Sequence, residues 1–210
     1  MYDQMPKSDG NAPRVLIAPS WQEDNILDSC LDEMLKPMLG KGLEIIVRPH
    51  PEYLKRYPQR MDAIRKRYED YKGDDLTFEL DFTSNESIYQ SDILITDWST
   101  ICFEFSYVTL NPCLFINTPM KVMNKEYKQI GIEPLELKLR REIGVSLEIN
   151  EADKTYLEIE KMLKAKGSYA EKILQIRNTY VSNFGKNGEV AGKYIIQSLI
   201  KKQNEKKQRS

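Results

Sequence analysis

Two short polar segments hold the residues of this chain whose types and spacing are best suited to chemistry. Asp97-Trp98-Ser99-Thr100 ends the apolar run 93–96 and precedes an amphipathic run at 101–108. Free backbone N–H groups collect where a strand turns into a helix, so small hydroxyl residues at such a turn favour anion binding. Arg48-Pro49-His50-Pro51 follows the apolar run 43–47 in the same way and holds the only histidine of 210 residues. Two polar strand ends predict a single crevice.

Arg48 and His50 could together neutralise a phosphate group. An arginine offers a planar pair of donors for phosphate oxygens, and a protonated imidazole stabilises charge that builds on a leaving phosphate. The alternative is structural, in which the two residues only end a strand and cap the next helix. The prolines on both sides of His50 favour the functional interpretation.

Ser99 and Thr100 are interpreted as phosphate-binding residues. The alternative is simple N-capping, which uses the same backbone N–H groups. Asp97 could accept a hydrogen bond from a ligand hydroxyl or orient the turn, and the structural role is favoured. No second acidic residue lies near Asp97 in sequence, so the sequence predicts no metal site.

Two further groups of residues have weaker signals. Trp21 and Trp98 follow predicted strands and could stack on a nucleobase, although packing against neighbouring loops is the favoured role. Lys121, Lys125 and Lys128 could reach a phosphate, but lysines are common in loops.

The composition excludes several classes of protein. A formal net charge of −1, with 30% charged residues of both signs, lacks the uniform field that gripping nucleic acid requires. Cys30, Cys102 and Cys113 have no metal-ligand spacing and indicate buried thiols in a reducing compartment. No run approaches the roughly 20 apolar residues of a membrane span, and the N-terminus lacks a secretion signal. We expect a cytoplasmic protein that uses no cofactor.

The elements that must position these residues alternate between strands and helices. Apolar runs predict strands at 14–18, 43–47, 76–80, 93–96, 113–116 and 144–149. Helical spacing predicts helices at 26–39, 52–71, 99–108, 151–164, 169–184 and 189–201, with an irregular segment at 117–142. Thr83-Ser84-Asn85-Glu86 has the spacing of a capping box for a further, short helix that ends at Gln90.

This pattern predicts an α/β fold, a doubly wound, Rossmann-like parallel sheet of five or six strands with a helical C-terminus. Ligands of such sheets bind at the carboxyl ends of the strands, where both polar turns fall. We expect a linker at 1–13, a nucleotide-binding domain at 14–200 and a disordered basic tail at 201–210. The tail could contact anionic lipid at the inner face of the membrane. The polar start of the chain suggests a piece of a longer protein.

The order of these turns resembles the CDP-glycerol glycerophosphotransferase family, the teichoic acid polymerases and primases. The resemblance covers roughly residues 14–200 and rests on Leu16–Trp21, Arg48–Pro51, Ser91–Thr100, Phe103–Phe105, Asn111-Pro112 and Asn187–Ala191. The chain departs from the family pattern at Gln22, Trp98 and Glu104, where the family more often has arginine, tyrosine and aspartate.

The resemblance implies that this chain is the C-terminal, nucleotide-binding half of a two-domain GT-B fold, with an acceptor-side N-terminal domain upstream. Such enzymes move glycerol phosphate from CDP-glycerol to a hydroxyl of a lipid-linked or polymeric acceptor and release CMP. Carried over by position, His50 is the catalytic histidine, Ser99 and Thr100 are the hydroxyl pair of the phosphate turn, and Asp97 is the acid at the strand end. Glu104 lies where GT-B proteins often bind the ribose, although it could be a solvated helix position. The isolated chain is expected to bind its donor without catalysing transfer.

The leading hypothesis is therefore the donor half of a cell-wall or capsule polymer transferase that uses CDP-glycerol or a related CDP-alditol. Half of a glycosyltransferase that uses a UDP- or CDP-sugar would keep the same turns. A non-catalytic nucleotide-binding or interaction module on the same fold is the alternative from a different class.

Overall fold

A computed structural model describes residues 12–71, 73–120, 122 and 124–209. Backbone contacts divide these residues into two compact units, 12–174 and 175–209. Residues 1–11 of the expected linker and Lys121 lie outside the described residues. The fold is described first for unit 12–174 and then for unit 175–209.

Unit 12–174 contains a parallel sheet whose described strands have the order β3-β2-β1-β4-β5-β6. This sheet confirms the predicted parallel α/β fold, and each strand matches an expected run within one or two residues. The strands are β1 (Arg14–Ile17), β2 (Glu44–Val47), β3 (Leu76–Phe78), β4 (Ile93–Thr96), β5 (Cys113–Asn117) and β6 (Gly144–Glu148).

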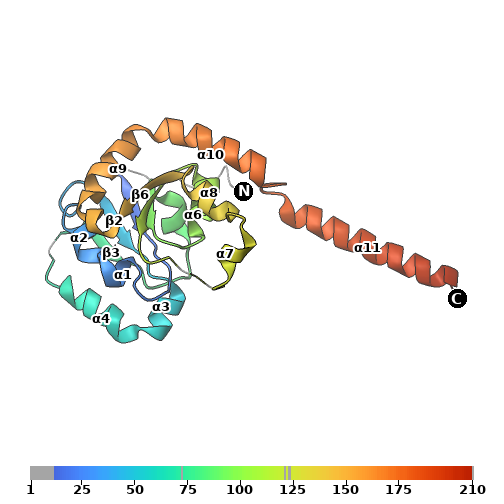
Figure 1. The fold of residues 1–210 in the computed structure, drawn as a ribbon, viewed down its shortest axis with the longest axis horizontal. Coiled ribbons are helices and arrows are strands. Elements are labelled where there is room, and N and C mark those ends of the chain that lie inside the picture. The colour runs from blue at the N-terminus through green and yellow to red at the C-terminus, as the bar shows by residue number, and fades with distance from the viewer. Residues whose placement is uncertain (1–11, 72, 121, 123, 210) are drawn as a thin grey trace. The chain divides into compact units, whose positions relative to one another are not determined.

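Helices cover both faces of the sheet, as Figure 1 shows. The described helices are α1 (Ile26–Ser29), α2 (Leu31–Leu35), α3 (Pro51–Arg56), α4 (Pro58–Arg67), α5 (Glu86–Gln90), α6 (Ile101–Thr109), α7 (Tyr127–Ile130), α8 (Leu135–Arg140), the 3-10 helix η2 (Ile149–Lys154), α9 (Thr155–Lys164), α10 (Lys166–Tyr180) and α11 (Asn187–Arg209). The last of these belongs to unit 175–209, and α10 crosses the boundary between the units.

Alternate residues of the central strands are buried on opposite faces. One cluster joins Val15, Ile17 and Ile95 of the strands to residues of α1–α4 and α9. Leu16 and Cys113 are also fully buried but lie outside that cluster. The Cys113 thiol lies 3.3 Å from the Ser106 hydroxyl of α6, so α6 covers this second face. Burial on both faces explains why the strands read as continuous apolar runs rather than as alternating ones.

The strand order places three polar loops at one edge of the sheet. Ile17, the last residue of β1, pairs with Val47 of β2 on one side and with Ile95 of β4 on the other. The chain therefore leaves β1, β2 and β4 at neighbouring points. In open α/β sheets this reversal of strand order is where ligands bind.

Two expected helices are each interrupted in the structure. The helix expected at 26–39 breaks at Cys30, whose φ of −155° is extended, and leaves α1 and α2. The helix expected at 52–71 breaks at Tyr57 (φ −129°), because Pro58 restricts the residue before it and then begins α4. Helical spacing of apolar residues does not reveal such breaks, since both pieces keep the same buried face.

Other local expectations are also corrected. The segment 117–142 is not wholly irregular, since it holds α7 and α8. The helix that ends at Gln90 was expected to have Thr83 as its cap, but α5 begins at Glu86, and Ser84 Oγ, rather than the side chain of Thr83, accepts the hydrogen bond from the Glu86 N–H at 3.1 Å. The α6 helix begins at Ile101, so Ser99 and Thr100 belong to the turn before it.

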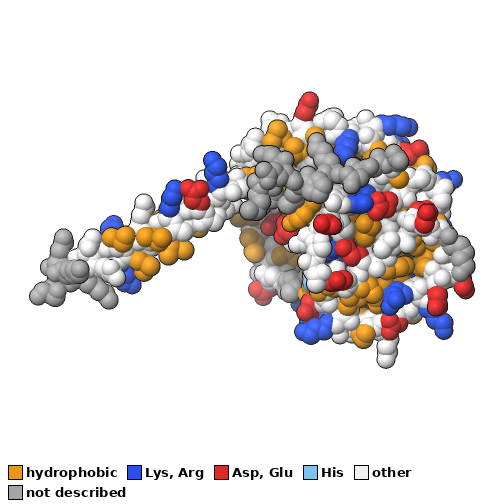
Figure 2. Space-filling view, turned by 180° about the vertical axis from the view of Figure 1, so that it is seen from behind, with side chains coloured by type: hydrophobic (Ala, Val, Ile, Leu, Met, Phe, Trp, Pro, Cys, Tyr) orange, Lys and Arg blue, Asp and Glu red, His pale blue; other side chains and the backbone are white. Residues whose placement is uncertain are grey.

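Unit 175–209 is helical and includes most of the expected tail. α11 continues to Arg209, where a disordered tail at 201–210 was expected. Lysine, glutamine and glutamate have high helix propensity and extend a helix without docking a face. Figure 2 shows hydrophobic side chains gathered along α11, and the exposed ones are Val190, Tyr194, Ile195, Ile196, Leu199 and Ile200. Among the described residues, none of the helices has the length and hydropathy to cross a bilayer.

Candidate functional site

A cleft of about 340 Å³ lies at the carboxyl ends of the strands. The loops after β1 and β2, the start of α5 and the turn before α6 form its walls. The residues that line it are Ala18, Pro19, Arg48, Pro49, His50, Pro51, Phe82, Asn85, Ile88, Ser99, Thr100, Ile101 and Glu104. The two polar turns expected to meet in one crevice thus share one cleft, with Glu104 beside them. Asp97 does not line it.

The turn before α6 presents backbone donors to this cleft. Thr100, the N-cap residue, makes no side-chain capping hydrogen bond, and Ser99 Oγ accepts only a long one, 3.5 Å, from the Ile101 N–H. Strong N-capping, the structural alternative for these hydroxyls, is therefore not what the geometry shows. The N-terminus of α6 keeps N–H groups and the positive end of its dipole directed to an anion.

His50 caps the helix that follows it. Its Nδ1 accepts a hydrogen bond from the Glu52 N–H at 3.0 Å, so the expected capping role is present. An imidazolium carries a proton on Nδ1 and cannot accept there. This geometry fits a neutral ring with its proton on Nε2, in place of the protonated imidazole that the sequence suggested. A neutral ring can still donate from Nε2 to a phosphate oxygen.

Arg48 is held inside the wall of the cleft. Its side chain forms an ion pair with Glu79 at 2.8 Å and hydrogen bonds with Ser87 and Asn85 at 3.1 Å each. The residue is 7% exposed, and its guanidinium lies over the Phe82 ring. The donor fork expected for phosphate is thus engaged by the protein itself, because β3 pairs with β2 and brings Glu79 beside it. Arg48 shapes the cleft.

Asp97 is buried beneath the turn. One carboxylate oxygen accepts hydrogen bonds from the N–H groups of Ser20 (2.8 Å) and Trp98 (2.6 Å), and the other accepts one from Ile26 (3.4 Å). Burial raises the pKa of Asp97, although these hydrogen bonds oppose the rise. The carboxylate therefore ties the loop after β1 to the turn after β4, which is the structural role that the sequence favoured.

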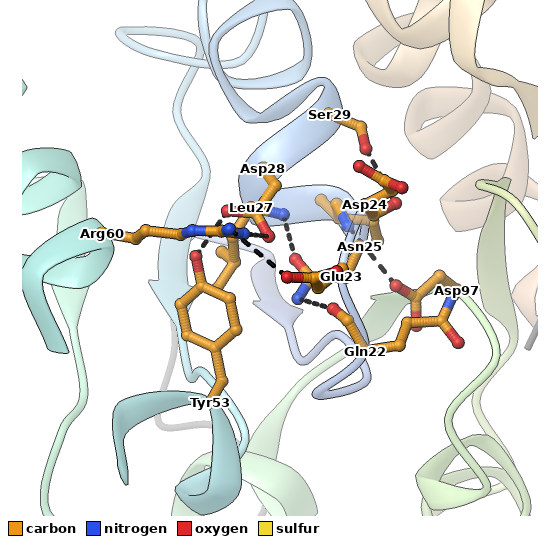
Figure 3. Close-up of polar contacts among 11 residues, drawn as sticks. Gln22, Glu23, Asp24, Asn25, Leu27, Asp28, Ser29, Tyr53, Arg60 and Asp97 are labelled. Atoms are coloured by element: carbon orange, nitrogen blue, oxygen red, sulfur yellow. Dashed lines mark hydrogen bonds and ion pairs between the residues drawn. The ribbon is translucent and has the colours of Figure 1, made fainter. Parts of the chain in front are cut away.

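The loop between β1 and α1 is fixed by polar contacts that Figure 3 shows. Asn25 caps α1 by accepting a hydrogen bond from the Leu27 N–H at 2.8 Å. Asp28 accepts hydrogen bonds from Tyr53 (2.7 Å) and from Arg60 (3.2 Å). Gln22, at the position where the resembling family more often has arginine, donates to the Pro119 carbonyl at 2.8 Å. These contacts tie the loop after β1, which supplies Ala18 and Pro19 to the cleft, to neighbouring elements.

Neither tryptophan presents two open faces for a nucleobase. The Arg56 guanidinium lies 4.7 Å from the Trp21 ring centroid, and that of Arg140 lies 4.3 Å from the Trp98 ring centroid. Trp98 also donates through Nε1 to the Thr118 carbonyl at 2.8 Å. These contacts support the packing role for both rings.

Two lysines of the segment after β5, Lys125 and Lys128, do not line the cleft. Lys125 and Lys128 are exposed and are absent from its lining. A second cavity of about 260 Å³, lined mostly by apolar side chains of α6 and of 120–140, shares Ser99 and Thr100 with the cleft. Within the ranges that the structure describes, no three or more His, Cys, Asp or Glu side chains are grouped to hold a metal ion.

Sequence reasoning missed several residues of the site. Phe82 follows β3, so the rule that located the turns after β2 and β4 could have found it. Asn85 and Ile88 come from α5 and carry no separate signal. Arg140, which contacts Trp98, lies in a segment expected to be irregular.

Comparison with known proteins supplies a family and a fold. The profile of the CDP-glycerol:poly(glycerophosphate) glycerophosphotransferases matches residues 2–128, more than half of the chain. A comparison with curated proteins finds no match.

Two solved structures share the fold. A variant of the wall teichoic acid polymerase TagF is 19% identical with a TM-score of 0.55, and the match covers 97% of this chain and 47% of that one. A glycosyltransferase from Rickettsia africae ESF-5 is 16% identical with a TM-score of 0.56, over 86% of this chain and 47% of that one. The chain spans about half the length of these structures.

Proposed function

The chain belongs to the CDP-glycerol:poly(glycerophosphate) glycerophosphotransferase family, and from this premise we propose that it is the donor-nucleotide-binding part of a transferase. The donor is CDP-glycerol or a related CDP-alditol, and the acceptor is a hydroxyl of a cell-wall or capsule polymer. The remaining part of the enzyme, which binds the acceptor, corresponds to the half of the solved relatives that this chain does not cover.

One observation carries the proposal. A single cleft at the reversal of strand order joins the N-terminus of α6, with Ser99 and Thr100, to His50 and Glu104. A diphosphate fits the N–H groups of the turn, because these groups and the helix dipole favour negative charge. Glu104 lies about one helical turn further on, where a ribose joined to that phosphate would place its hydroxyl groups.

The chemistry follows from this placement. Attack of the acceptor hydroxyl on the phosphorus of glycerol phosphate breaks the bond to the bridging oxygen and leaves CMP, whose phosphate gains negative charge. The α6 N–H groups stabilise that charge as it develops, and the Nε2–H of His50 donates a hydrogen bond to the departing phosphate. His50 acts in this scheme as a neutral donor. We expect this chain to bind the donor without completing the transfer.

The test is a calorimetric titration with CDP, using UDP and GDP as controls. We expect selective CDP binding that weakens about tenfold or more in His50→Ala and in the double variant Ser99→Ala/Thr100→Ala, because each loses a hydrogen bond to a charged phosphate. The double variant Thr83→Ala/Ser84→Ala is a matched control, since this pair also precedes a helix but does not line the cleft. It should bind CDP as the unchanged chain does.

Other outcomes would identify the alternatives. Tighter binding of UDP would contradict a CDP donor and support part of a nucleotide-sugar glycosyltransferase. No binding of any nucleotide would contradict the donor site in this chain and support a non-catalytic module. Unchanged CDP affinity in both site variants would place the nucleotide outside this cleft.

A further inference from the structure

Arg140, the last residue of α8, is held between two aromatic rings. Its guanidinium carbon lies 4.3 Å from the ring centroid of Trp98 and 4.3 Å from that of Phe115. Its Nη1 donates a hydrogen bond to Asn117 Oδ1 at 2.8 Å. Phe115 and Asn117 belong to β5, so the arginine connects that strand to the turn before α6.

Burial of the Arg140 guanidinium at this position costs free energy. The Nε and Nη2 atoms of Arg140 are shielded from solvent and have no hydrogen-bond partner among the described residues. Burial lowers the pKa of Arg140, which reports the cost of removing its charge from water. Apolar side chains of similar volume commonly replace buried charges without loss of stability. The stability of the fold therefore does not account for an arginine at this position.

Trp98, which the Arg140 guanidinium contacts, directly precedes two residues of the candidate site in the sequence. Trp98 is followed by Ser99 and Thr100, and its backbone N–H donates to Asp97. Its indole N–H fixes the edge of the ring to the Thr118 carbonyl, while the guanidinium covers the ring face. A ring held at its edge and its face cannot rotate, so the backbone of the turn is constrained with it.

We propose that Arg140 is a positioning residue for the turn 97–100, holding Ser99 and Thr100, through Trp98, in the conformation that binds the donor phosphate. The choice of CDP as the ligand rests on the proposed function. Arg140 lines the second cavity but not the cleft itself. It therefore acts through Trp98 rather than by contact with the nucleotide.

The first experiment compares CDP affinity with thermal stability in the full chain. Arg140→Met removes the charge and the planar group but keeps much of the apolar volume. It should weaken CDP binding about tenfold, the loss that corresponds to one desolvated cation–π contact. The unfolding midpoint should stay the same or rise.

Two further variants make this comparison specific. Arg140→Lys keeps the charge without the planar group and should recover only part of the affinity. Arg141→Met is the matched control, since the Arg141 side chain is 59% exposed and pairs with Glu133, and it should bind CDP normally.

The second experiment reads the position of Trp98 directly. The chain has two tryptophans, so Trp21→Phe leaves Trp98 as the only one. In this background, Arg140→Met should shift the fluorescence emission of Trp98, and Arg141→Met should not. A role in packing alone would change the unfolding midpoint without this combination of lost affinity and shifted emission.

Several results would overturn the inference. These are CDP affinity within twofold of the unchanged chain in Arg140→Met, an equal loss in Arg141→Met, or an unchanged emission. If the unchanged chain does not bind CDP, the proposed function fails, and the emission experiment still decides whether Arg140 holds Trp98. If Arg140→Met does not fold, Arg140→Lys provides both readouts.

Discussion

At the scale of single residues, Asp97 shows how a strand-end acid can serve the backbone instead of a ligand. Its carboxylate accepts hydrogen bonds from three backbone N–H groups in two loops, and the residue is 1% exposed. A buried N–H that loses its acceptor carries the full cost of its desolvation. The loops that form the cleft therefore depend on this one side chain.

Asp97→Ala should lower the free energy of unfolding by about 3 kcal/mol, because the N–H groups of Ser20 and Trp98 lose their acceptor. Urea denaturation measures the change. Asp81→Ala is the matched control, since Asp81 also follows a strand and accepts from a backbone N–H, that of Thr83, but is exposed. A loss in Asp97→Ala no larger than in the control would contradict this role.

The three cysteines should be unreactive in the folded chain. Burial raises the pKa of Cys30 and of Cys102 to about 12 and raises that of Cys113 well above its usual value. At pH 8, a thiol with such a pKa is thiolate in roughly one molecule in ten thousand, and the thiolate is the reactive form.

We therefore expect almost no colour from Ellman's reagent with native chain at pH 8, and three thiols per chain after denaturation. The reaction of the native chain should speed up as the pH rises. A thiol that reacts at once in the native chain at pH 8 would show that its site is open to solvent.

The positions of the site residues were more predictable from sequence than their partners. The carboxyl ends of parallel strands meet at one edge, so the turns holding His50 and Ser99 could be placed together. The partners of Arg48 and Trp98 could not be predicted, because Glu79 and Arg140 come from other elements and carry no local signal. His50 caps α3 through Nδ1, so this nitrogen accepts a hydrogen bond. A strand-end pattern does not specify which ring nitrogen takes that role.

At the scale of elements, strands were predicted better than helices. Four of the described strands, β1, β2, β4 and β5, are buried runs, and such runs are visible in sequence even where the pairing is not. Helix boundaries depended instead on single backbone conformations, such as that of Tyr57 before Pro58. The pairing of β6 with β5 depends on the absence of a side chain at Gly144. The sequence pattern gives no sign of that requirement.

Gly144→Ala should cost several kcal/mol of stability. A Cβ at this position would lie 1.8 Å from the Cys113 carbonyl oxygen, a backbone atom that cannot move without breaking the pairing of β5 with β6. We expect a loss of about 3 kcal/mol or more, comparable with severe overpacking. Thermal and urea denaturation measure it.

Gly167→Ala is the control for this prediction. Gly167 lies in α10, and a Cβ there meets no atom within 4 Å. Alanine in an open helical position stabilises by about 0.5–1 kcal/mol, because it restricts the unfolded chain. If both variants lost the same stability, the close approach at Gly144 would not be the cause.

At the scale of the whole molecule, backbone contacts divide the described residues into two compact units, whereas the sequence suggested one domain over 14–200. The contacts of the α/β unit end near residue 174, and α11 keeps large apolar side chains exposed. The sequence did not reveal this boundary, because apolar residues at helical spacing look the same whether or not the helix is packed. Most of the stability of a helix in a protein comes from packing of its apolar face rather than from helix propensity.

Removal of residues 187–210 should therefore leave the cooperative unfolding of the α/β unit unchanged, with a midpoint within about 2 °C of the full chain. Near-ultraviolet circular dichroism follows that unit, since Trp21 and Trp98 both lie in it. In the full chain, far-ultraviolet signal from α11 should be lost at lower temperature than the near-ultraviolet signal. A large drop in the midpoint after truncation would show that α11 stabilises the unit.

The central place of β1 has a consequence for how the chain is made. Val15 pairs with Ile45 on one side and with Ile93 on the other, so β1 gains its second neighbour only after α1–α5, β2 and β3 have been synthesised. Until then one apolar edge of β1 remains open to pairing with other chains. The arrival of β4 covers this edge, so pairing of β1 with other chains is most favoured while residues 18–96 are being synthesised.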